Sequence, residues 1–484
     1  MADKLSAIRI TPPPTALAIV RRLQSAGHEA VFVGGCVRDA LMGRRPHDWD
    51  IATSATPETV EALFAPHTVP VGKQFGIIIV VAPDGTNYEV ATFRGEADYA
   101  DGRHPDRVTF VPMKEDVLRR DFTVNALLYD PLRERVLDFV GGLDDLRARR
   151  LRAVGEPARR FEEDKLRVLR AVRFAANLCF DIETATWEGV RQTAPYVKAV
   201  VSPERIAAET DKMLTGGHAC EAMRLMESSG LLAALFPELA ACIGVDQPPQ
   251  FHPEGDVWQH TLKLLALLDE TVLRCRGKGE PASPAERFDA NGALAAASET
   301  ELRALAWAGL LHDIGKPPTF FRGEDRIHFN GHDVIGAQMA VDFLKRLKMP
   351  NSLMEPVEYL VGGHMHLILL LQARLATRLR RYRDPRFPLL LELNRLDSLA
   401  SFGGLDKQRA LTAEWLAEAL KPPPLKPTLN GRDLLKLGLK PGPAFGELLK
   451  RAEDHELETP FRDRDEALAW LKAEIAAAEK TASR

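Results

Sequence analysis

Two aspartates on either side of a tryptophan are the residues of this sequence whose spacing is best suited to catalysis. The string Asp48-Trp49-Asp50-Ile51 has the character of an extended segment, in which side chains two residues apart point to the same side. Two carboxylates held in this way repel each other unless a cation lies between them. Oxygen ligands suit Mg²⁺, and a pair of such ions can activate a 3′-hydroxyl and stabilise a leaving pyrophosphate. We expect Glu89 to supply a third carboxylate from a neighbouring strand; the alternative is an ordinary surface pair.

A glycine pair lies shortly before these carboxylates. Gly34-Gly35-Cys36-Val37-Arg38 follows an apolar strand and opens a helix. Glycines let the backbone approach a ligand closely, and a helix N-terminus offers free N–H groups to an anion. Arg38 adds a positive charge over bound phosphates. The competing interpretation is a turn with no ligand.

A third polar string runs from Arg119 to Ala126 and leads into the apolar pair Leu127-Leu128. It contains Arg119, Arg120, Asp121 and Asn125. Half-buried arginine and asparagine side chains of this kind can hold a triphosphate and ribose hydroxyls. A structural Arg–Asp pair is the other interpretation.

Histidines and aspartates in the second half of the chain form a separate group. Adjacent His and Asp residues, with further histidines and a distal aspartate on other helices, can ligate a divalent metal. A helical scaffold without metal chemistry is the alternative. The candidates are His260, His312, Asp313, His332, His364 with His366, and Asp397.

The surrounding elements divide into a mixed part and a helical part. Before Leu146 we predict a helix over 15–27, strands over 30–33, 77–81, 88–92, 127–129 and 136–139, and a hairpin turn at Pro83-Asp84-Gly85. After it, apolar residues recur at helical spacing. Proline pairs and triplets at 248–249 and 422–424 mark boundaries, and 276–300 has the composition of a loop. We therefore predict four parts: a mixed head with the paired aspartates over 1–148, a helical neck over 149–245, a helical domain with the histidine group over 246–410, and a helical tail over 411–484.

Charge, cysteine spacing and the lack of long apolar runs limit which classes of protein the sequence can represent. The 484 residues carry a formal net charge of −4, so the net charge does not by itself indicate a nucleic-acid partner. The five cysteines are scattered with no Cys-x-x-Cys pair, which argues against a disulfide framework and suits a reducing cytoplasm. No run of eighteen apolar residues is present, so we expect no membrane span.

The three strings before Leu127, taken in order, resemble the catalytic domain of the bacterial and eukaryotic CCA-adding tRNA nucleotidyltransferases and the related bacterial poly(A) polymerases. Thr92-Phe93-Arg94 and the loop Tyr99 to Pro105 also resemble that family. The resemblance implies an α+β head of the DNA polymerase β type with a five-stranded mixed sheet, followed by an all-α body and tail. It implies Mg²⁺ at Asp48 and Asp50, and nucleotide contacts from Gly34, Gly35, Arg38, Arg94, Arg119, Arg120, Asp121 and Asn125.

The string Glu163 to Arg170 resembles the base-selecting motif of the same family. If it lies on the first long helix, Asp164 and Arg167 at i and i+3 share one face, and Arg170 belongs to the same nucleotide site. The pairing edges of C and A each present an amino donor beside a ring-nitrogen acceptor, whereas U and G present a carbonyl acceptor beside a ring N–H. One carboxylate and one guanidinium therefore select C and A without a template. A surface ion pair is the alternative.

The histidine group resembles the HD superfamily of metal-dependent phosphohydrolases. The resemblance implies a site for a divalent transition metal or Mg²⁺, with His260, His312, Asp313 and Asp397 as primary ligands and His332, His364 and His366 beside them. The implied function of the whole chain is CCA addition to the tRNA 3′ end (the acceptor arm) from CTP and ATP, with hydrolysis of phosphates at RNA ends. Addition of A or of CC alone, poly(A) synthesis, a pure phosphohydrolase and a non-catalytic tRNA-binding protein remain as alternatives. The oligomeric state is open.

Overall fold

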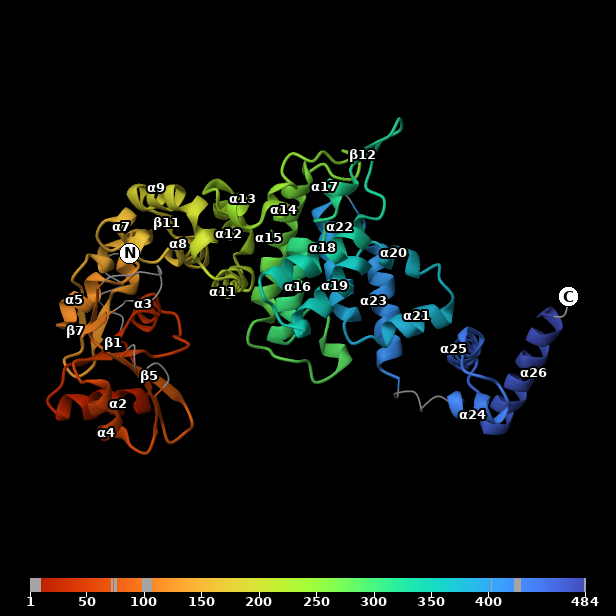
Figure 1. The fold of residues 1–484 in the computed structure, drawn as a ribbon, viewed down its shortest axis with the longest axis horizontal. Coiled ribbons are helices and arrows are strands. Elements are labelled where there is room, and N and C mark those ends of the chain that lie inside the picture. Colours follow the sequence, from red (N-terminus) through yellow and green to blue (C-terminus); the bar gives the residue numbers. More distant parts are fainter. Residues whose placement is uncertain are drawn as a thin grey trace. The chain divides into compact units, whose positions relative to one another are not determined.

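The computed structural model describes residues 10–70, 73, 76–97, 107–401, 403–421 and 428–482. The chain forms two compact units, Met1–Ala240 and Ala241–Arg484, drawn in Figure 1. The loop expected from Tyr99 to Pro105 and the triple proline at 422–424 lie outside the described residues. Over the part of the chain that is described, no helix combines the length and apolarity that a membrane span requires.

A mixed sheet forms the centre of the first unit. Its strand order is β3-β4-β5-β2-β1-β8-β9. β2 and β5 pair in parallel, and the other neighbours are antiparallel. The predicted hairpin at 83–85 is confirmed, because it joins the antiparallel strands β4 and β5. The strands are β1 (Ala30–Val33), β2 (Ile51–Thr53), β3 (Thr68–Val69), β4 (Ile77–Val81), β5 (Asn87–Thr92), β8 (Leu128–Asp130) and β9 (Arg135–Leu137).

The sheet has seven strands, and the expectation of five is corrected. The strands beyond the five ranges predicted from the sequence are β2 and β3, which hold only three and two residues. Segments this short leave little periodic signal in a sequence. The α+β class of the head is confirmed.

Helices pack against the sheet and continue it into a helical region. α2 contacts β1, and α4 contacts β4, so the apolar side of the sheet is covered where β1 is buried at all four residues. A second antiparallel pair consists of β6 (Arg94–Ala97) and β7 (Arg107–Phe110), which follow β5 along the chain. The helices of this part are α2 (Pro14–Ser25), α3 (Gly35–Leu41), α4 (Pro57–Phe64), α5 (Met113–Leu118), η2 (Thr123–Asn125) and α6 (Gly142–Ala148).

The rest of the first unit is helical, with one minor pair of two-residue strands, β10 (Arg150–Leu151) and β11 (Asp181–Ile182). Its longest apolar stripe belongs to α8, which buries ten of its thirteen residues. α11 and α12 pack against that helix. The helices are α7 (Pro157–Glu163), α8 (Leu166–Leu178), α9 (Thr184–Thr193), η3 (Ala194–Tyr196), α10 (Val197–Val200), α11 (Pro203–Leu214), α12 (Ala219–Ser228), α13 (Leu231–Leu235) and α14 (Pro237–Ala240).

The second unit is built on α15, α16, α18, α19 and α22, which pack against one another. α15 begins where the Asp256 side chain accepts from Gln259 N, and α16 begins at a capping box of Ser298 and Glu301. The bounds are α15 (Val257–Cys275), η4 (Pro284–Glu286), α16 (Glu299–Leu311), α17 (Lys316–Thr319), β12 (Phe321–Arg322), β13 (Ile327–His328), α18 (His332–Arg346), α19 (Asn351–Gly363), α20 (Leu367–Leu370), α21 (Leu375–Tyr382), α22 (Phe387–Ala400) and α23 (Asp406–Ala419).

The last helices have a small core of their own, formed by apolar residues such as Leu434, Leu448 and Leu471. They are α24 (Gly431–Lys436), α25 (Pro443–Glu458) and α26 (Arg464–Ala482). α25 also contacts α21.

Candidate active site and metal centre

Asp48, Asp50 and Glu89 meet at the junction of β2 and β5. Ile51 pairs with Val90 in parallel register, which places Asp50 and Glu89 at neighbouring positions just before that pair. Trp49 is 7% exposed and packs edge-on against Phe32, with ring centroids 5.0 Å apart. Because Trp49 points inward, Asp48 and Asp50 point the other way. The sheet therefore gathers three carboxylates on one side.

These carboxylates repel one another in the absence of a cation. Burial, followed by the negative charges of Glu89 and Asp48, raises the pKa of Asp50 to about 6, and Arg120 only partly offsets this. A divalent cation would relieve the repulsion, and an all-oxygen donor set suits a hard ion. The residues present therefore fit a divalent metal.

The glycine pair and the Arg119–Asn125 string lie side by side at this site. Gly34 has a φ of 81°, a left-handed conformation that favours glycine, and it ends β1 so that α3 can begin. Arg38 is buried and donates to Asn125 Oδ1 at 2.5 Å and to Asp39 Oδ1 at 2.8 Å. Two strings 87 residues apart are thus connected by one guanidinium.

A buried aspartate that the sequence analysis missed organises three of the predicted nucleotide-contacting arginines. Asp116 accepts from Arg119 Nη2 at 2.7 Å, from Arg120 Nη2 at 3.1 Å and from the backbone N–H of Arg94 at 3.2 Å. Burial disfavours its charge, but Arg119 and Arg120 outweigh burial and lower the pKa of Asp116. The i, i+3 and i, i+4 spacing from Asp116 is the signal that could have identified it.

Asp121 pairs with an arginine from the helical region. Arg170 donates to Asp121 Oδ2 from Nε at 2.8 Å and from Nη2 at 2.6 Å. Burial works against ionisation, yet this pair outweighs it and lowers the pKa of Asp121 to about 2. Arg38 and Arg170 also lie over the ring of Phe174, at 5.3 and 5.1 Å from its centroid. The structural Arg–Asp pair therefore exists, and it ties the sheet to α8.

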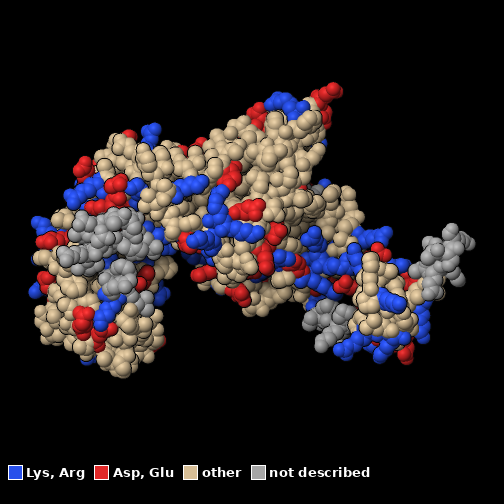
Figure 2. Space-filling view, viewed as in Figure 1, with Lys and Arg blue, Asp and Glu red and all other residues tan. Residues whose placement is uncertain are grey.

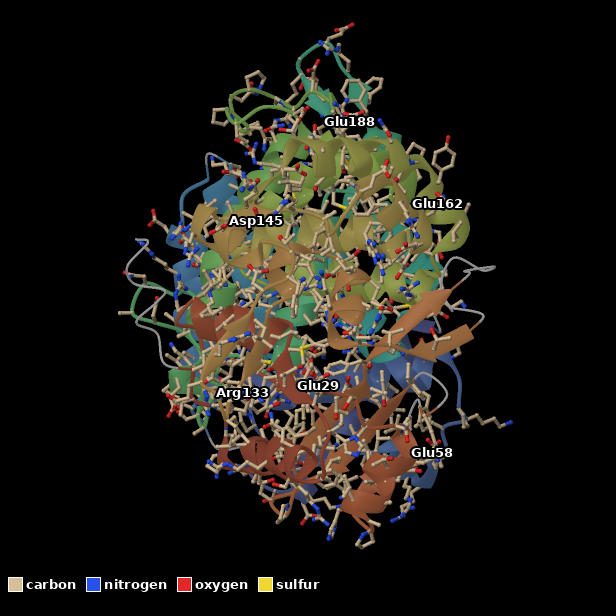
Figure 3. The ribbon with its side chains drawn as sticks, turned by 90° about the vertical axis from the view of Figure 1, so that its left-hand side faces the viewer. Glu29, Glu58, Arg133, Asp145, Glu162 and Glu188 are labelled. Atoms are coloured by element: carbon tan, nitrogen blue, oxygen red, sulfur yellow. The ribbon has the colours of Figure 1, made fainter. Side chains whose placement is uncertain are left out.

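Asp145, labelled in Figure 3, holds the Arg119–Asn125 string in place, because it accepts from Thr123 Oγ1 at 2.7 Å. Asp145 is fully buried and also holds Arg150 and Arg152 through their Nε atoms. Both arginines belong to the arginine-rich segment from Arg147 to Arg160. They therefore stabilise the head itself.

The expected helical placement of Asp164 is wrong. Glu163 ends α7, Asp164 has extended backbone with a φ of −148°, and α8 begins only at Leu166. Asp164 and Arg167 consequently do not share a helix face. Asp164 pairs with Arg205 at 2.8 Å, whereas Arg167 pairs with Glu163 at 2.8 Å. The Leu166 N–H donates to Asp164 Oδ1 at 3.0 Å, so Asp164 ends one helix and begins the next.

The second unit brings the predicted metal ligands together around Asp313. Its Oδ2 lies 3.1 Å from His312 Nε2 and 3.8 Å from His260 Nε2. Its Oδ1 lies 3.6 Å from His332 Nε2 and 3.8 Å from His364 Nε2. Asp397 approaches His260 Nε2 to 3.0 Å. Each oxygen of Asp313 thus faces a different pair of histidines.

The hydrogen bonds of these histidines show which nitrogen is available to a metal. Nδ1 of His312, His332 and His364 lies 2.6–2.9 Å from the backbone carbonyls of Gly309, Phe329 and Val361. A carbonyl only accepts, so each Nδ1 carries the proton and each Nε2 presents a lone pair. The Nε2 atoms of His312, His332 and His364 are buried without a hydrogen bond. Nitrogen lone pairs without a hydrogen-bond partner fit divalent metal binding. Asp313 lies between two positions that a metal ion could take.

His366 lies outside this cluster. Its side chain is 58% exposed, and its Nδ1 lies 3.3 Å from Asp333 Oδ2. The structure does not bring it to Asp313.

Two residues that the sequence analysis did not assign complete the centre. Glu254 Oε1 lies 2.6 Å from His260 Nδ1 and 2.9 Å from His252 Nδ1. Burial opposes protonation, but hydrogen bonds to Asp397 and Glu254 outweigh it and raise the pKa of His260 to about 9. Lys316 Nζ contacts Asp313 Oδ2 at 2.7 Å and donates to Gln247 Oε1 at 2.7 Å.

We predict that Glu254→Gln weakens metal binding by about 10- to 100-fold, because a carboxylate behind a ligating histidine fixes its tautomer and raises its basicity. Titration of the purified chain with Mn²⁺ or Ni²⁺ by calorimetry measures the effect. The matched control is Glu299→Gln, an exposed carboxylate at the start of α16. Equal affinities in the wild type and Glu254→Gln would contradict the role.

The metal centre opens into a cavity of ≈ 410 Å³. Asp313, His332, His364 and Asp397 line its floor, and Lys316, Arg326 and His328 bring positive or protonatable groups to its walls. Its size is in the range of small-molecule sites. The cavity can therefore receive a phosphate-bearing ligand at the metal ligands.

Known protein families match three parts of the chain. Residues 30–152 match the poly A polymerase head domain, residues 179–243 match the "probable RNA and SrmB-binding site of polymerase A", and residues 258–400 match the HD domain. The chain therefore carries a match to the poly A polymerase head domain and a match to the HD domain in the same polypeptide.

The chain is similar to curated CCA-adding enzymes. It is 45% identical over 216 residues to the one of Limosilactobacillus reuteri, covering 44% of this chain and 52% of the relative. It is 47% identical over 231 residues to that of Geobacillus kaustophilus, covering 48% and 56%. The chain thus spans about half the length of the curated relatives it matches.

Solved structures extend the likeness over almost the whole chain. The Bacillus stearothermophilus CCA-adding enzyme in complex with CTP has a TM-score of 0.66 and 28% identity, covering 97% of this chain and 100% of that chain. The Thermotoga maritima CCA-adding enzyme complexed with tRNA has a TM-score of 0.55 and 20% identity, covering 98% of each. The second likeness bears on the fold alone.

Proposed function

We propose that this chain adds CCA to tRNA 3′ ends from CTP and ATP by nucleotidyl transfer at Asp48, Asp50 and Glu89. The observation that carries the proposal is the cluster of three carboxylates, in which burial and then the charges of Glu89 and Asp48 raise the pKa of Asp50 to about 6. Similarity to CCA-adding enzymes, one of them solved with CTP, supports it.

Each group in the head has a role in this proposal. Two Mg²⁺ ions, when bound, would supply the positive charge that activates the 3′-hydroxyl and stabilises pyrophosphate. Asp48, Asp50 and Glu89 would hold them. Arg38 and Asn125, held together at 2.5 Å, would orient the nucleotide, with Gly34 and Gly35 allowing close approach. The further nucleotide contacts would come from Arg94, Arg119, Arg120, Asp121, Asp164, Arg167 and Arg170.

The decisive test is 3′-end extension of three tRNA substrates that end at the discriminator base, after CC and after CCA, with each nucleotide alone and combined. Addition of C, C and A with a stop after CCA supports the proposal. Addition of A to the CC-ended substrate alone would assign an A-adding specialist, and addition of CC alone a CC-adding one. No addition to any substrate would overturn nucleotidyl transfer.

Asp164 is proposed to select the base together with Arg167. We predict that Asp164→Ala relaxes the discrimination of CTP and ATP against UTP and GTP by roughly tenfold or more, because a lost hydrogen-bonding partner contributes about 1–3 kcal/mol. Competing incorporation of the four nucleotides measures it. Glu162→Ala is the matched control, since Glu162 is a neighbouring exposed carboxylate, labelled in Figure 3. An unchanged preference in Asp164→Ala would remove Asp164 from base selection.

A second activity is proposed for the HD domain: hydrolysis of phosphate esters at RNA ends. The observation in its favour is the set of three buried Nε2 atoms, of His312, His332 and His364, without hydrogen-bond partners around Asp313. One or two divalent ions, when bound, would polarise the phosphate and the attacking water. Lys316 and Arg326 would neutralise the ester from the cavity wall.

We further propose the division into a head (1–148), a neck (149–245), an HD domain (246–410) and a tail (411–484). The cytoplasm is the proposed compartment, because all five cysteines are free thiols.

A further inference from the structure

A short hairpin forms one wall of the HD cavity and projects from its unit, as Figure 1 shows at β12. Phe321 pairs with His328 and Arg322 with Ile327. Ile327, His328 and Phe329 line the same cavity as Asp313 and the other metal ligands. Whatever binds the hairpin is therefore adjacent to the metal centre.

Aromatic rings at this wall are exposed to solvent. Phe321 is 64% exposed and Phe320 40%, and Phe251, which lines the same cavity, is 50% exposed. The ring of Phe320 lies 5.9 Å from that of Phe329, and the ring of Phe321 lies 6.4 Å from that of His328. Clustered exposed rings of this kind indicate a binding surface more than a packing defect.

Two of these rings, Phe320 and Phe251, have a cation beside them. Arg322 lies 6.0 Å from the centroid of Phe320, and Arg326 lies 5.8 Å from that of Phe251. Figure 2 shows basic side chains on the projecting hairpin with acidic ones at its tip. Asp325 of the hairpin accepts from His328 Nε2 at 2.8 Å, and Arg322 pairs with Asp246, which lies outside the hairpin, at 3.0 Å.

Exposed rings interleaved with guanidinium groups are the combination that binds single-stranded nucleic acid, since rings stack on bases and cations contact the backbone. The metal ligands that line the cavity would take a phosphate, whereas Phe320 and Phe321 lie outside the cavity lining. A free phosphate or a small ester reaches only the floor. A strand with a terminal phosphate reaches the floor, the cations and the rings together.

We propose that the β12–β13 hairpin, with Phe251 facing it, is a binding arm for the last nucleotides of a single-stranded nucleic acid whose terminal phosphate enters the HD metal centre. This inference rests on the proposed hydrolase function for its catalytic consequence, but the binding itself does not depend on turnover. It names the substrate class as phosphate-ended oligonucleotides in preference to small phosphate esters.

The first test measures binding without metal. A 3′-phosphorylated trinucleotide that carries 2-aminopurine loses fluorescence when the base stacks. We expect Phe321→Ala to weaken its binding about tenfold, the effect of losing one base–aromatic stack, and Phe321→Tyr to retain it. Leu420→Ala is the matched control, because Leu420 is 58% exposed in the same unit. Thermal unfolding checks that each variant is folded.

The second test compares kcat/KM for that trinucleotide with kcat/KM for p-nitrophenyl phosphate in the presence of Mg²⁺, Mn²⁺ or Ni²⁺. We expect the ratio to fall about tenfold in Phe321→Ala. Unchanged binding in Phe321→Ala would overturn the inference and assign the rings to a protein partner. A wild-type chain that binds the trinucleotide but hydrolyses neither substrate would overturn the hydrolase proposal and leave the binding arm supported.

Discussion

Asp50→Asn is expected to abolish nucleotide incorporation, by at least about a thousandfold, while tRNA binding persists. The carboxylates at the β2–β5 junction are proposed to hold metal and not RNA, and the charge stabilisation from a catalytic metal amounts to several kcal/mol. Single-turnover incorporation with a CC-ended tRNA measures the loss, and a gel-shift assay measures binding. Asp84→Asn, on the exposed turn between β4 and β5, is the control.

Stability should move in the opposite direction to activity in that variant. A pKa raised to about 6 means that the folded state binds more protons than the unfolded one, whose Asp pKa is about 3.9. Folding stability therefore falls as pH rises through the window between these values, and at pH 7 the ionised Asp50 destabilises the metal-free fold. We expect Asp50→Asn to raise the free energy of unfolding by about 1–2 kcal/mol without Mg²⁺, after solvent screening. Denaturant unfolding tests this, and a less stable, inactive variant would indicate misfolding.

His312→Ala is the second change with a large expected effect. It should remove metal-stimulated phosphate hydrolysis, to below about a hundredth of the wild-type rate, because losing a ligand costs more than losing a residue that only holds a ligand in place. CCA addition should remain. The reason is that His312 and its neighbours lie in a compact unit different from that of Asp48 and Asp50. Release of phosphate from a 3′-phosphorylated oligonucleotide and extension of tRNA are measured on one preparation.

A control of the same residue type is available in that unit. His366→Ala removes an exposed histidine outside the cluster and should leave hydrolysis intact. Since His312 is buried, His312→Gln serves as a second variant that preserves volume. Loss of both activities in His312→Gln, with a lowered melting temperature, would give His312 a structural role instead.

Local patterns predicted the elements that rest on local chemistry. The β4–β5 hairpin follows from a Pro-Asp-Gly turn between two β-branched runs, and β1 from a four-residue apolar run bounded by glycine. The convergence of His260, His312, Asp313, His332, His364 and Asp397 was also predicted, through the spacing typical of HD proteins. What those residues do remains a proposal.

Contacts between distant segments were not predictable in this way. Asp121 and Arg170 are 49 residues apart, and nothing in their separation reveals the pair. Asp164 was placed on a helix because its neighbours have helical spacing, yet its side chain accepts from the backbone of Leu166 and ends the pattern. Glu254 escaped notice because it lies before α15 and reaches His260 across the helix start.

The burial of Trp49 has a consequence for insertions and deletions. Side chains alternate along the extended segment from Asp48 into β2. A shift of this segment by one position would bring Trp49 to the surface and direct a carboxylate against Phe32. The sheet would lose a packed indole at the same moment as the site lost its aspartates. We therefore expect insertions and deletions in this short stretch to prevent folding, and not only to remove catalysis. Changes a few residues earlier, in the exposed stretch at 43–45, should be tolerated. The spacing of the two aspartates is thus maintained by the hydrophobic core as much as by the reaction.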